Sequence, residues 1–325
     1  MTILDTRAAL SARSTIPADV LAEIKAASLH GDVVSVTAQA YVFSGNVLKA
    51  NTITFASGGY LLLDKLVGPW IAVVAKTIKF AAPEERAYVV QPTSTVFPVA
   101  GSPHPSLGQA GQGNHGGSTK AGGAGGPGAP GTIGNLGLSG PPVPTLYLVA
   151  ESILTQPGNV PPDFIDLYLD CRGIDGAAGG PGQNGQVGGV GGSGGPADWN
   201  GVYCEGGAGD GGPGGSAGAG GTGGPGGNGS NGGAVFYAGS AAAINLLEFS
   251  KVNNLQGRRG AGGAAGNNGS PGAGGPRGER RGDCDGGVQG PIGSNSAASP
   301  QIGPDGQDGE RGKIYTAVVD VNFLF

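Results

Sequence analysis

The chain has 325 residues, of which 71 are glycine and only 13% are charged. This composition excludes both a highly charged disordered tail and an average globular enzyme. The formal net charge of -5 is spread thinly, so we expect no nucleic-acid partner. No apolar stretch approaches the roughly 20 residues that span a bilayer, and we expect no membrane span. The N-terminus has no basic head followed by an apolar core, so no secretory signal peptide is recognisable.

Residues 16–27 predict a short amphipathic helix near the N-terminus. Thr15 is available as an N-cap, and Pro17 suits the first helical turn. Leu21 and Ile24 then share one face of the helix. We interpret residues 1–31 as an N-terminal arm that carries this helix.

From residue 32 onward, short β-branched runs separated by Gly, Asn and Ser predict strands. The clearest runs cover residues 33–36, 47–55, 60–63 and 71–80. The segment 50–56 matches the segment 75–81 at an offset of 25 residues, and a weaker copy starts at Val149. Such a repeat is typical of a parallel β-solenoid, for which residues 164–169, 234–249 and 314–325 would supply further strands. A β-sandwich is the alternative.

Glycine recurs at every third residue in four long tracts. These tracts cover residues 122–140, 173–194, 206–227 and 257–278 without a break in the register. Three residues per turn is the period of an extended helix that has no internal hydrogen bonds. Because glycine occupies one face of every turn, neighbouring backbones can approach closely enough to bond to each other. We therefore expect the tracts to be packing elements, not loose linkers.

Second glycines in the same tracts favour polyglycine II over collagen. In the third tract they stand at Gly207, Gly211, Gly214, Gly220, Gly223 and Gly226. A Gly-Gly-X turn leaves two bare faces for neighbouring helices, whereas collagen needs one glycine per triplet and many prolines. A parallel collagen homotrimer is the runner-up, favoured by residues 303–312, and free disorder is the third possibility.

The predicted fold class is mainly β: a parallel β-solenoid-like core interleaved with a polyglycine II (PGII) helix bundle, plus the short N-terminal helix. Apolar segments alternate with the glycine tracts, which indicates one domain after the arm. This domain covers residues 32–325. Its glycine-rich polyglycine II excursions would lie at about 101–140, 173–233 and 257–312.

The triplet tracts, roughly half of the chain, carry a resemblance to known families through motifs such as Gly-Gly-Pro-Gly-Gly-Asn-Gly-Ser-Asn-Gly at residues 223–232. They resemble the polyglycine II bundles of phage tail-fibre tip adhesins and of springtail antifreeze proteins and, more loosely, bacterial collagen-like surface proteins. The strand portion matches neither of the first two families. In the adhesins, binding sits on variable loops that join the glycine helices. The resemblance therefore implies ligand-contact loops at residues 197–203 and 277–285.

The candidate ligand contacts in these two loops are Trp199, Tyr203, Arg277, Arg281 and Asp283. Exposed aromatic rings in a polar break between tracts could anchor a carbohydrate or a protein, while packing over the end of the bundle is the alternative. Residues 281–283 also spell an integrin-binding tripeptide, which chance explains in a chain so rich in glycine.

The end of the sequence supplies a candidate assembly surface. Residues 318–325 form an apolar run that predicts a final strand with no polar cap after it. We expect Phe323, Leu324 and Phe325 to contact a second copy of the chain.

Catalytic machinery is not visible in the sequence. His30, His104 and His115 are scattered without evident partners, and there is no Ser/His/Asp order, HExxH motif or P-loop. Glu84 and its neighbour Glu85 follow a proline and are typical of a solvated turn. We expect no enzyme activity, no cofactor and no metal site.

The three cysteines are an odd number and leave the pairing open. A disulfide between Cys171 and Cys204 would bracket the second glycine tract. Three unpaired thiols are the alternative.

Two functional hypotheses follow. The leading one is a non-enzymatic structural protein that assembles with copies of itself into an extracellular fibre or surface layer. The alternative is a phage or bacterial receptor-binding adhesin that displays loops to a cell-surface carbohydrate or protein. Both hypotheses place the protein outside the cell, or on a cell or virion surface.

Overall fold

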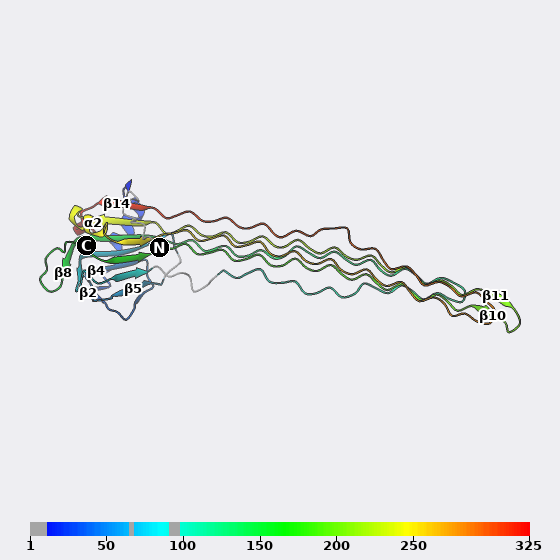
Figure 1. Ribbon diagram of the computed structural model, residues 1–325. Coiled ribbons are helices and arrows are strands. Elements are labelled where there is room, and N and C mark those ends of the chain that lie inside the picture. Colours follow the sequence, from blue (N-terminus) through cyan, green and yellow to red (C-terminus); the bar gives the residue numbers. More distant parts are fainter. Residues whose placement is uncertain (1–11, 65–67, 91–97) are drawn as a thin grey trace.

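The computed structural model describes residues 12–64, 68–90 and 98–325. Figure 1 shows a β-body at one end, where the C-terminus lies, and a long thin shaft that leads away from it. We define the β-body as residues 12–90, 145–171, 234–253 and 313–325, and the shaft as the three stretches between them, within the described residues. No helix in the described part of the chain has the length and apolar character needed to cross a membrane.

Two sheets, each with all its strands parallel, build the β-body. The larger has seven strands in the order β1-β14-β12-β8-β6-β4-β2, and the smaller has five in the order β13-β9-β7-β5-β3. The larger comprises β1 (Ala12–Arg13), β14 (Ile314–Val318), β12 (Val235–Gly239), β8 (Thr145–Thr155), β6 (Trp70–Phe80), β4 (Val47–Phe55) and β2 (Gly31–Val36). The smaller comprises β13 (Lys251–Asn253), β9 (Leu167–Asp170), β7 (Ala87–Val90), β5 (Tyr60–Leu63) and β3 (Tyr41–Phe43).

The sequence repeat at an offset of 25 residues sets the register between β4 and β6. Ile53 pairs with Ile78 and Phe55 pairs with Phe80, so equivalent side chains lie on top of one another. The two phenylalanine rings stack with their centroids 5.4 Å apart. The weaker third copy continues the row, because Ile78 pairs with Ile153 of β8. The strands predicted over residues 33–36, 47–55, 60–63 and 71–80 are confirmed.

Apolar side chains fill both faces of the seven-stranded sheet. Its inner face packs against the five-stranded sheet, through fully buried residues such as Leu48, Leu61 and Leu148. Its outer face packs against helix α1 (Ala18–Ala26) and the short 3-10 helix η2 (Val321–Leu324). Each buried leucine or isoleucine contributes about 1.5–3 kcal/mol relative to an exposed one, so these two layers are the main source of body stability.

Helix α1 confirms the predicted N-terminal helix, although its N-cap is Pro17 and not Thr15. Lys49 on the neighbouring strand β4 holds its C-terminal end. The Lys49 Nζ donates hydrogen bonds to the carbonyls of Ile24, Lys25 and Ala27 at 3.2, 3.1 and 3.0 Å. These bonds satisfy carbonyls that a helix leaves unpaired at its end. Burial lowers the pKa of the Lys49 ammonium, because desolvation disfavours its charged form.

The predicted fold class, a parallel β-solenoid-like core interleaved with a polyglycine II bundle, is wrong. The chain instead forms two large parallel sheets, and the seven-stranded sheet lies between the smaller sheet and helical elements. This layered arrangement resembles an α/β fold. The repeat predicted local strand pairing correctly, but it gave no information on the helices that cover the outer face.

Two segments predicted as strands contain helices. Within residues 234–249, β12 ends at Gly239 and helix α2 (Ala241–Leu247) follows, because the Ser240 hydroxyl caps it by accepting from the Ala243 amide at 3.1 Å. Within residues 314–325, β14 ends at Val318. The Asp320 carboxylate then accepts from the Asn322 amide at 3.0 Å and starts η2.

The shaft consists of extended glycine-rich legs that carry no helix and few strand residues. Within the described residues, three legs lead outward from the β-body (101–117, 173–196 and 257–278) and three lead back (120–140, 206–232 and 287–312). The legs bond to one another at every third residue; Gly182 donates to Ala264 and Gly224 donates to Gly180, at 2.9 and 2.8 Å.

Glycine is required in the shaft because the legs lie too close together for a side chain between them. A Cβ atom built on Gly223 would lie 1.8 Å from the carbonyl oxygen of Gly263. Outward-facing residues complete the bonding: Asn228 Oδ1 accepts from the Gln307 amide, and Asp210 Oδ1 accepts from the Val288 amide, both at 2.8 Å. The shaft is thus a network of backbone hydrogen bonds. At its surface, polar side chains accept hydrogen bonds from other backbone amides and so form a polar seal.

Candidate functional site

The far end of the shaft carries a small hairpin, which we call the tip (residues 197–206 and 279–286; Figure 1). Strand β10 (Asp198–Trp199) pairs with β11 (Cys204–Gly206) in antiparallel fashion. Asn200 organises the turn between them, because its Oδ1 accepts from the amides of Val202 and Tyr203, each at 3.0 Å. Its Nδ2 donates to Glu205 Oε1 at 2.8 Å. The turn is therefore a defined structure with its own hydrogen bonds.

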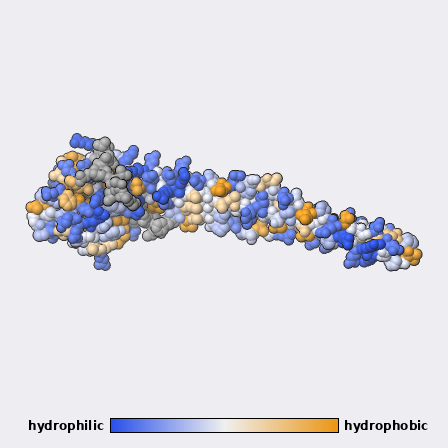
Figure 2. Space-filling model, viewed as in Figure 1, coloured by the Kyte–Doolittle hydropathy of each residue, from blue (hydrophilic) through white to orange (hydrophobic). Residues whose placement is uncertain are grey.

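Trp199 links the two loops of the tip. Gly282 has a φ of +53°, and a Cβ atom built on it would lie 2.5 Å from the Trp199 ring. The indole therefore packs directly over the glycine backbone, which no other residue would allow. Even so, 42% of the Trp199 surface remains exposed, together with 62% of Tyr203 and 85% of Val202. Figure 2 shows hydrophobic residues at this extreme end of the shaft.

A disulfide between Cys204 and Cys284 fastens the hairpin to the second loop. Both alternatives considered from the sequence, a disulfide between Cys171 and Cys204 and three unpaired thiols, are therefore wrong, since Cys171 is a buried free thiol in the β-body. Burial raises the pKa of that thiol, with a smaller contribution from the Asp170 carboxylate. Backbone bonds from Ala197 to Glu279 and from Ala208 to Asp285, at 3.0 and 2.9 Å, reinforce the junction.

The lengths of the glycine tracts contain a signal for the pairing of Cys204 with Cys284. The outward tracts 173–194 and 257–278 have the same number of triplets, so their ends reach the same height above the β-body. The breaks that follow them must then meet. This counting places Cys204 and Cys284 side by side, whereas Cys171 stays at the opposite end of the shaft.

The structure places four of the five predicted ligand contacts in the tip and the fifth, Arg277, in the adjoining leg. Trp199 and Tyr203 lie on the hairpin, and Arg277, Arg281 and Asp283 are all exposed at or beside the second loop. None of these three charged residues forms a salt bridge with any residue that the structure describes. The tip therefore presents aromatic rings next to unpaired charges of both signs.

The predicted assembly residues also have contacts within their own chain, although Phe323 and Phe325 remain partly exposed. Leu324 is buried under the outer face of the seven-stranded sheet. The Phe323 ring lies 3.4 Å from Lys25 Nζ, and the Phe325 ring lies 4.9 Å from Lys76 Nζ, measured to the ring centroids. These contacts fasten the C-terminal segment to its own β-body.

Two histidines expected to lack partners have them. His115 Nδ1 lies 2.5 Å from Ser193 Oγ on the shaft surface, and His104 Nε2 lies 2.8 Å from the Ile133 carbonyl. Neither arrangement includes a carboxylate that could orient the imidazole. Among the described residues, no group of three or more His, Cys, Asp or Glu side chains could hold a metal ion.

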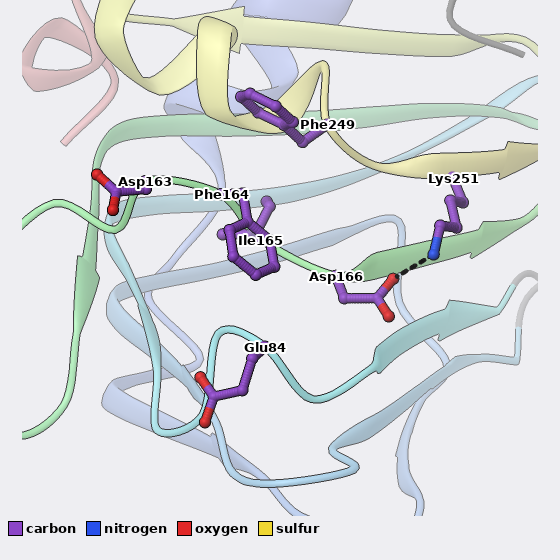
Figure 3. A pocket seen from close by; sticks show the side chains of 7 residues that line it. All are labelled: Glu84, Asp163, Phe164, Ile165, Asp166, Phe249 and Lys251. Atoms are coloured by element: carbon purple, nitrogen blue, oxygen red, sulfur yellow. Dashed lines mark hydrogen bonds and ion pairs between the residues drawn. The ribbon is translucent and has the colours of Figure 1, made fainter. Parts of the chain in front are cut away.

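A hollow of about 470 Å³ lies on the β-body, far from the tip. Its lining consists of Glu84, Asp163, Phe164, Ile165, Asp166, Phe249 and Lys251 (Figure 3). Asp166 forms ion pairs with Lys251 at 3.1 Å and with Arg86 at 3.3 Å. The sequence alone indicates only a solvated turn at Glu84, and no sequence pattern joins these distant segments.

Comparisons with known proteins give no family. No family model matches the chain, and no curated protein matches it. Among solved structures, the chain has a weak likeness to the nine polyproline type II helical bundle springtail antifreeze protein from Granisotoma rainieri. The identity is 22%, covering 62% of this chain and 96% of that chain, with a TM-score of 0.08. A TM-score this low carries no argument about the fold or function of this chain.

Proposed function

We propose that the protein is a non-enzymatic receptor-binding adhesin that presents the tip to a carbohydrate or protein on a cell surface. The observation that carries this proposal is the exposed turn containing Trp199, Val202 and Tyr203 at the end of the shaft. Large aromatic side chains supply contact area at low conformational cost, as in other recognition loops.

The construction of the shaft supports the proposal. Interior legs such as 206–232 bond to several neighbours at once, so bending the shaft would break many backbone bonds together. The disulfide and the packing of Trp199 over Gly282 fix the tip loops before any ligand arrives. Such preorganisation lowers the entropy that binding must overcome. A disulfide also suits an oxidising compartment, in line with a location outside the cell or on a virion surface.

Substitution of the two aromatic residues tests the proposal. Labelled protein would be applied to an array of cell-surface glycans and to immobilised bacterial cells. We expect the variant carrying Trp199→Ala and Tyr203→Ala to lose at least tenfold in binding to any surface that the wild type binds. Phe323→Ala, which removes an exposed ring on the β-body, is the matched control and should bind normally. Unchanged binding by the double variant, with an intact circular dichroism spectrum, would refute the assignment.

A second candidate function is self-assembly into an extracellular fibre or surface layer. The observation in its favour is the pair of edge strands β2 and β3. Each stands at one end of the strand order of its sheet within the described residues, and Val33 of β2 and Val42 of β3 are exposed. Open strand edges pair readily with other chains. Light scattering and electron microscopy over a range of concentrations test this function. A protein that stays monomeric throughout would contradict it.

A further inference from the structure

The hollow on the β-body is built from three segments that are distant in sequence. Glu84 precedes β7, residues 163–166 precede β9, and Phe249 and Lys251 follow helix α2 (Figure 3). Since β9 leads from this hollow directly into an outward leg, the hollow lies at the end of the β-body that faces away from the shaft. Its volume of about 470 Å³ falls within the range of about 300–1,000 Å³ that small ligands occupy.

Two phenylalanine rings give the hollow apolar walls. Phe164 is 48% exposed and Phe249 is 41% exposed, whereas Ile165, which follows Phe164 in the same loop, is buried and also lines the hollow. The rings come from different elements, and both line the same space (Figure 3). Exposed aromatic rings that converge on one hollow are typical of a ligand site, because such surface is normally buried.

The charges around these rings do not balance. Asp166 is paired with two cations, Lys251 and Arg86, so this group of three carries a net charge of +1. Glu84 and Asp163 are both exposed, and neither forms a hydrogen bond or ion pair with the described residues. The hollow therefore combines aromatic walls with two carboxylates that have no ion-pair partner among the described residues, and the charges of Glu84, Asp163, Asp166, Lys251 and Arg86 together leave one net negative charge. Both features attract a cation, the rings through their negative faces and the carboxylates through their charge.

We infer that this hollow binds an organic ammonium ion, whose alkyl groups contact Phe164 and Phe249 and whose charge faces Glu84 and Asp163. A bare divalent metal fits poorly, because it needs several oxygen ligands close together and the described residues contain no such cluster. An anion would be repelled by the two unpaired carboxylates and by the net negative charge around the hollow. The inference is independent of the proposed role of the tip, since the two sites lie at opposite ends of the molecule.

Choline and its uncharged carbon analogue, 3,3-dimethylbutan-1-ol, test the inference with ligands of the same shape. Binding to the full chain would be measured by saturation-transfer NMR at physiological salt. We expect choline to bind at least tenfold more tightly than the alcohol. N-Acetyl-lysine methylamide forms a second arm: if it binds more tightly than choline, the natural ligand is a protein side chain, and if choline binds more tightly, it is a small quaternary amine. Equal binding of choline and the alcohol, or no binding of either cation, would overturn the inference.

Variants locate the site. Glu84→Gln combined with Asp163→Asn should weaken choline binding at least tenfold, and Phe164→Leu should weaken it several-fold. All three positions are exposed, so we expect an unchanged melting temperature. Glu310→Gln, which removes an exposed carboxylate on the shaft, is the matched control and should bind choline like the wild type. Full binding by the double variant would contradict the assignment of this hollow.

Discussion

The β-body and the shaft use backbone hydrogen bonds between distant segments, but they depend on side chains in opposite ways. In the β-body, fully buried residues such as Leu148 fill the space between sheets. In the shaft, a Cβ on Gly223 would overlap a neighbouring carbonyl. One region is therefore sensitive to the loss of volume and the other to its addition. Glycine also costs on the order of 1 kcal/mol more backbone entropy than alanine, so the shaft needs its bonds collectively.

The strongest test of this contrast adds three methyl groups to one leg of the shaft. Cβ atoms at Gly220, Gly223 and Gly226 would lie 2.3, 1.8 and 2.1 Å from backbone oxygens of the neighbouring leg. We expect the triple alanine variant to lose more than about 5 kcal/mol of unfolding free energy, because the legs must separate. Thermal unfolding followed by circular dichroism measures this loss.

A matched triple variant shows whether overlap is the cause. Gly108, Gly111 and Gly117 also belong to the shaft, but nothing lies within 4 Å of a Cβ built on any of them. Replacing these three with alanine should leave the melting temperature nearly unchanged. If both triple variants melt alike, close packing is not what requires glycine.

The corresponding test of the β-body removes volume. Leu148→Ala should cost about 2–5 kcal/mol, since the side chain is fully buried between the sheets. Hydrogen exchange should accelerate in the strands around β8. Ile302→Ala on the shaft removes a similar but 70% exposed side chain and should cost less than about 0.5 kcal/mol. A comparable loss from Ile302→Ala would show that the shaft also has an apolar core.

The tip differs from both regions because a disulfide cross-links it. Replacing Cys204 and Cys284 by serine releases a cross-link between residues 80 positions apart. We expect a loss of about 2–4 kcal/mol, because the cross-link restricts the unfolded chain. Thermal unfolding of the wild type with and without reductant should give the same shift as the double variant. An unaltered melting temperature under full reduction would argue that the backbone network alone holds the tip.

The smallest expected effect concerns the polar seal on the shaft surface. Asn228→Ala removes the acceptor for the Gln307 amide and should cost about 1 kcal/mol. Exchange of that amide should accelerate, as measured by NMR. Gln112→Ala is the control, because this exposed side chain bonds to no described residue. Equal exchange at Gln307 in both variants would show that the side-chain seal contributes nothing.

Local patterns in the sequence predicted local structure well. β-Branched runs located β4 and β5 at their observed bounds, and the 25-residue offset matched Ile53 with its neighbour Ile78. Helix α2 was missed because its alanine-rich sequence continues directly from a strand, and only the Ser240 cap separates them. The fold class was wrong because helical cover on a sheet is a tertiary property. Nothing within residues 314–325 alone shows that Leu324 returns to the β-body.

The candidate sites were also predictable only where the signal is local in the sequence. Trp199 and Tyr203 were found because a break in the glycine register is visible in the sequence. The link between Cys204 and Cys284, and the hollow lined by Glu84 and Phe249, depend on distant segments meeting in space. Counting triplets along the two equal legs predicts the disulfide. No count along the sequence predicts the hollow.

The regular bonding between legs has a consequence for how such a protein can change in evolution. One extra triplet in a single leg would displace every later bond of that leg from its partners. The length of the shaft can therefore change only when all legs gain or lose a triplet at the same height. The turn at residues 200–203 lies outside this constraint, because its bonds are internal to the hairpin. Sequence drift should consequently accumulate at the tip, while the reach of the molecule stays fixed.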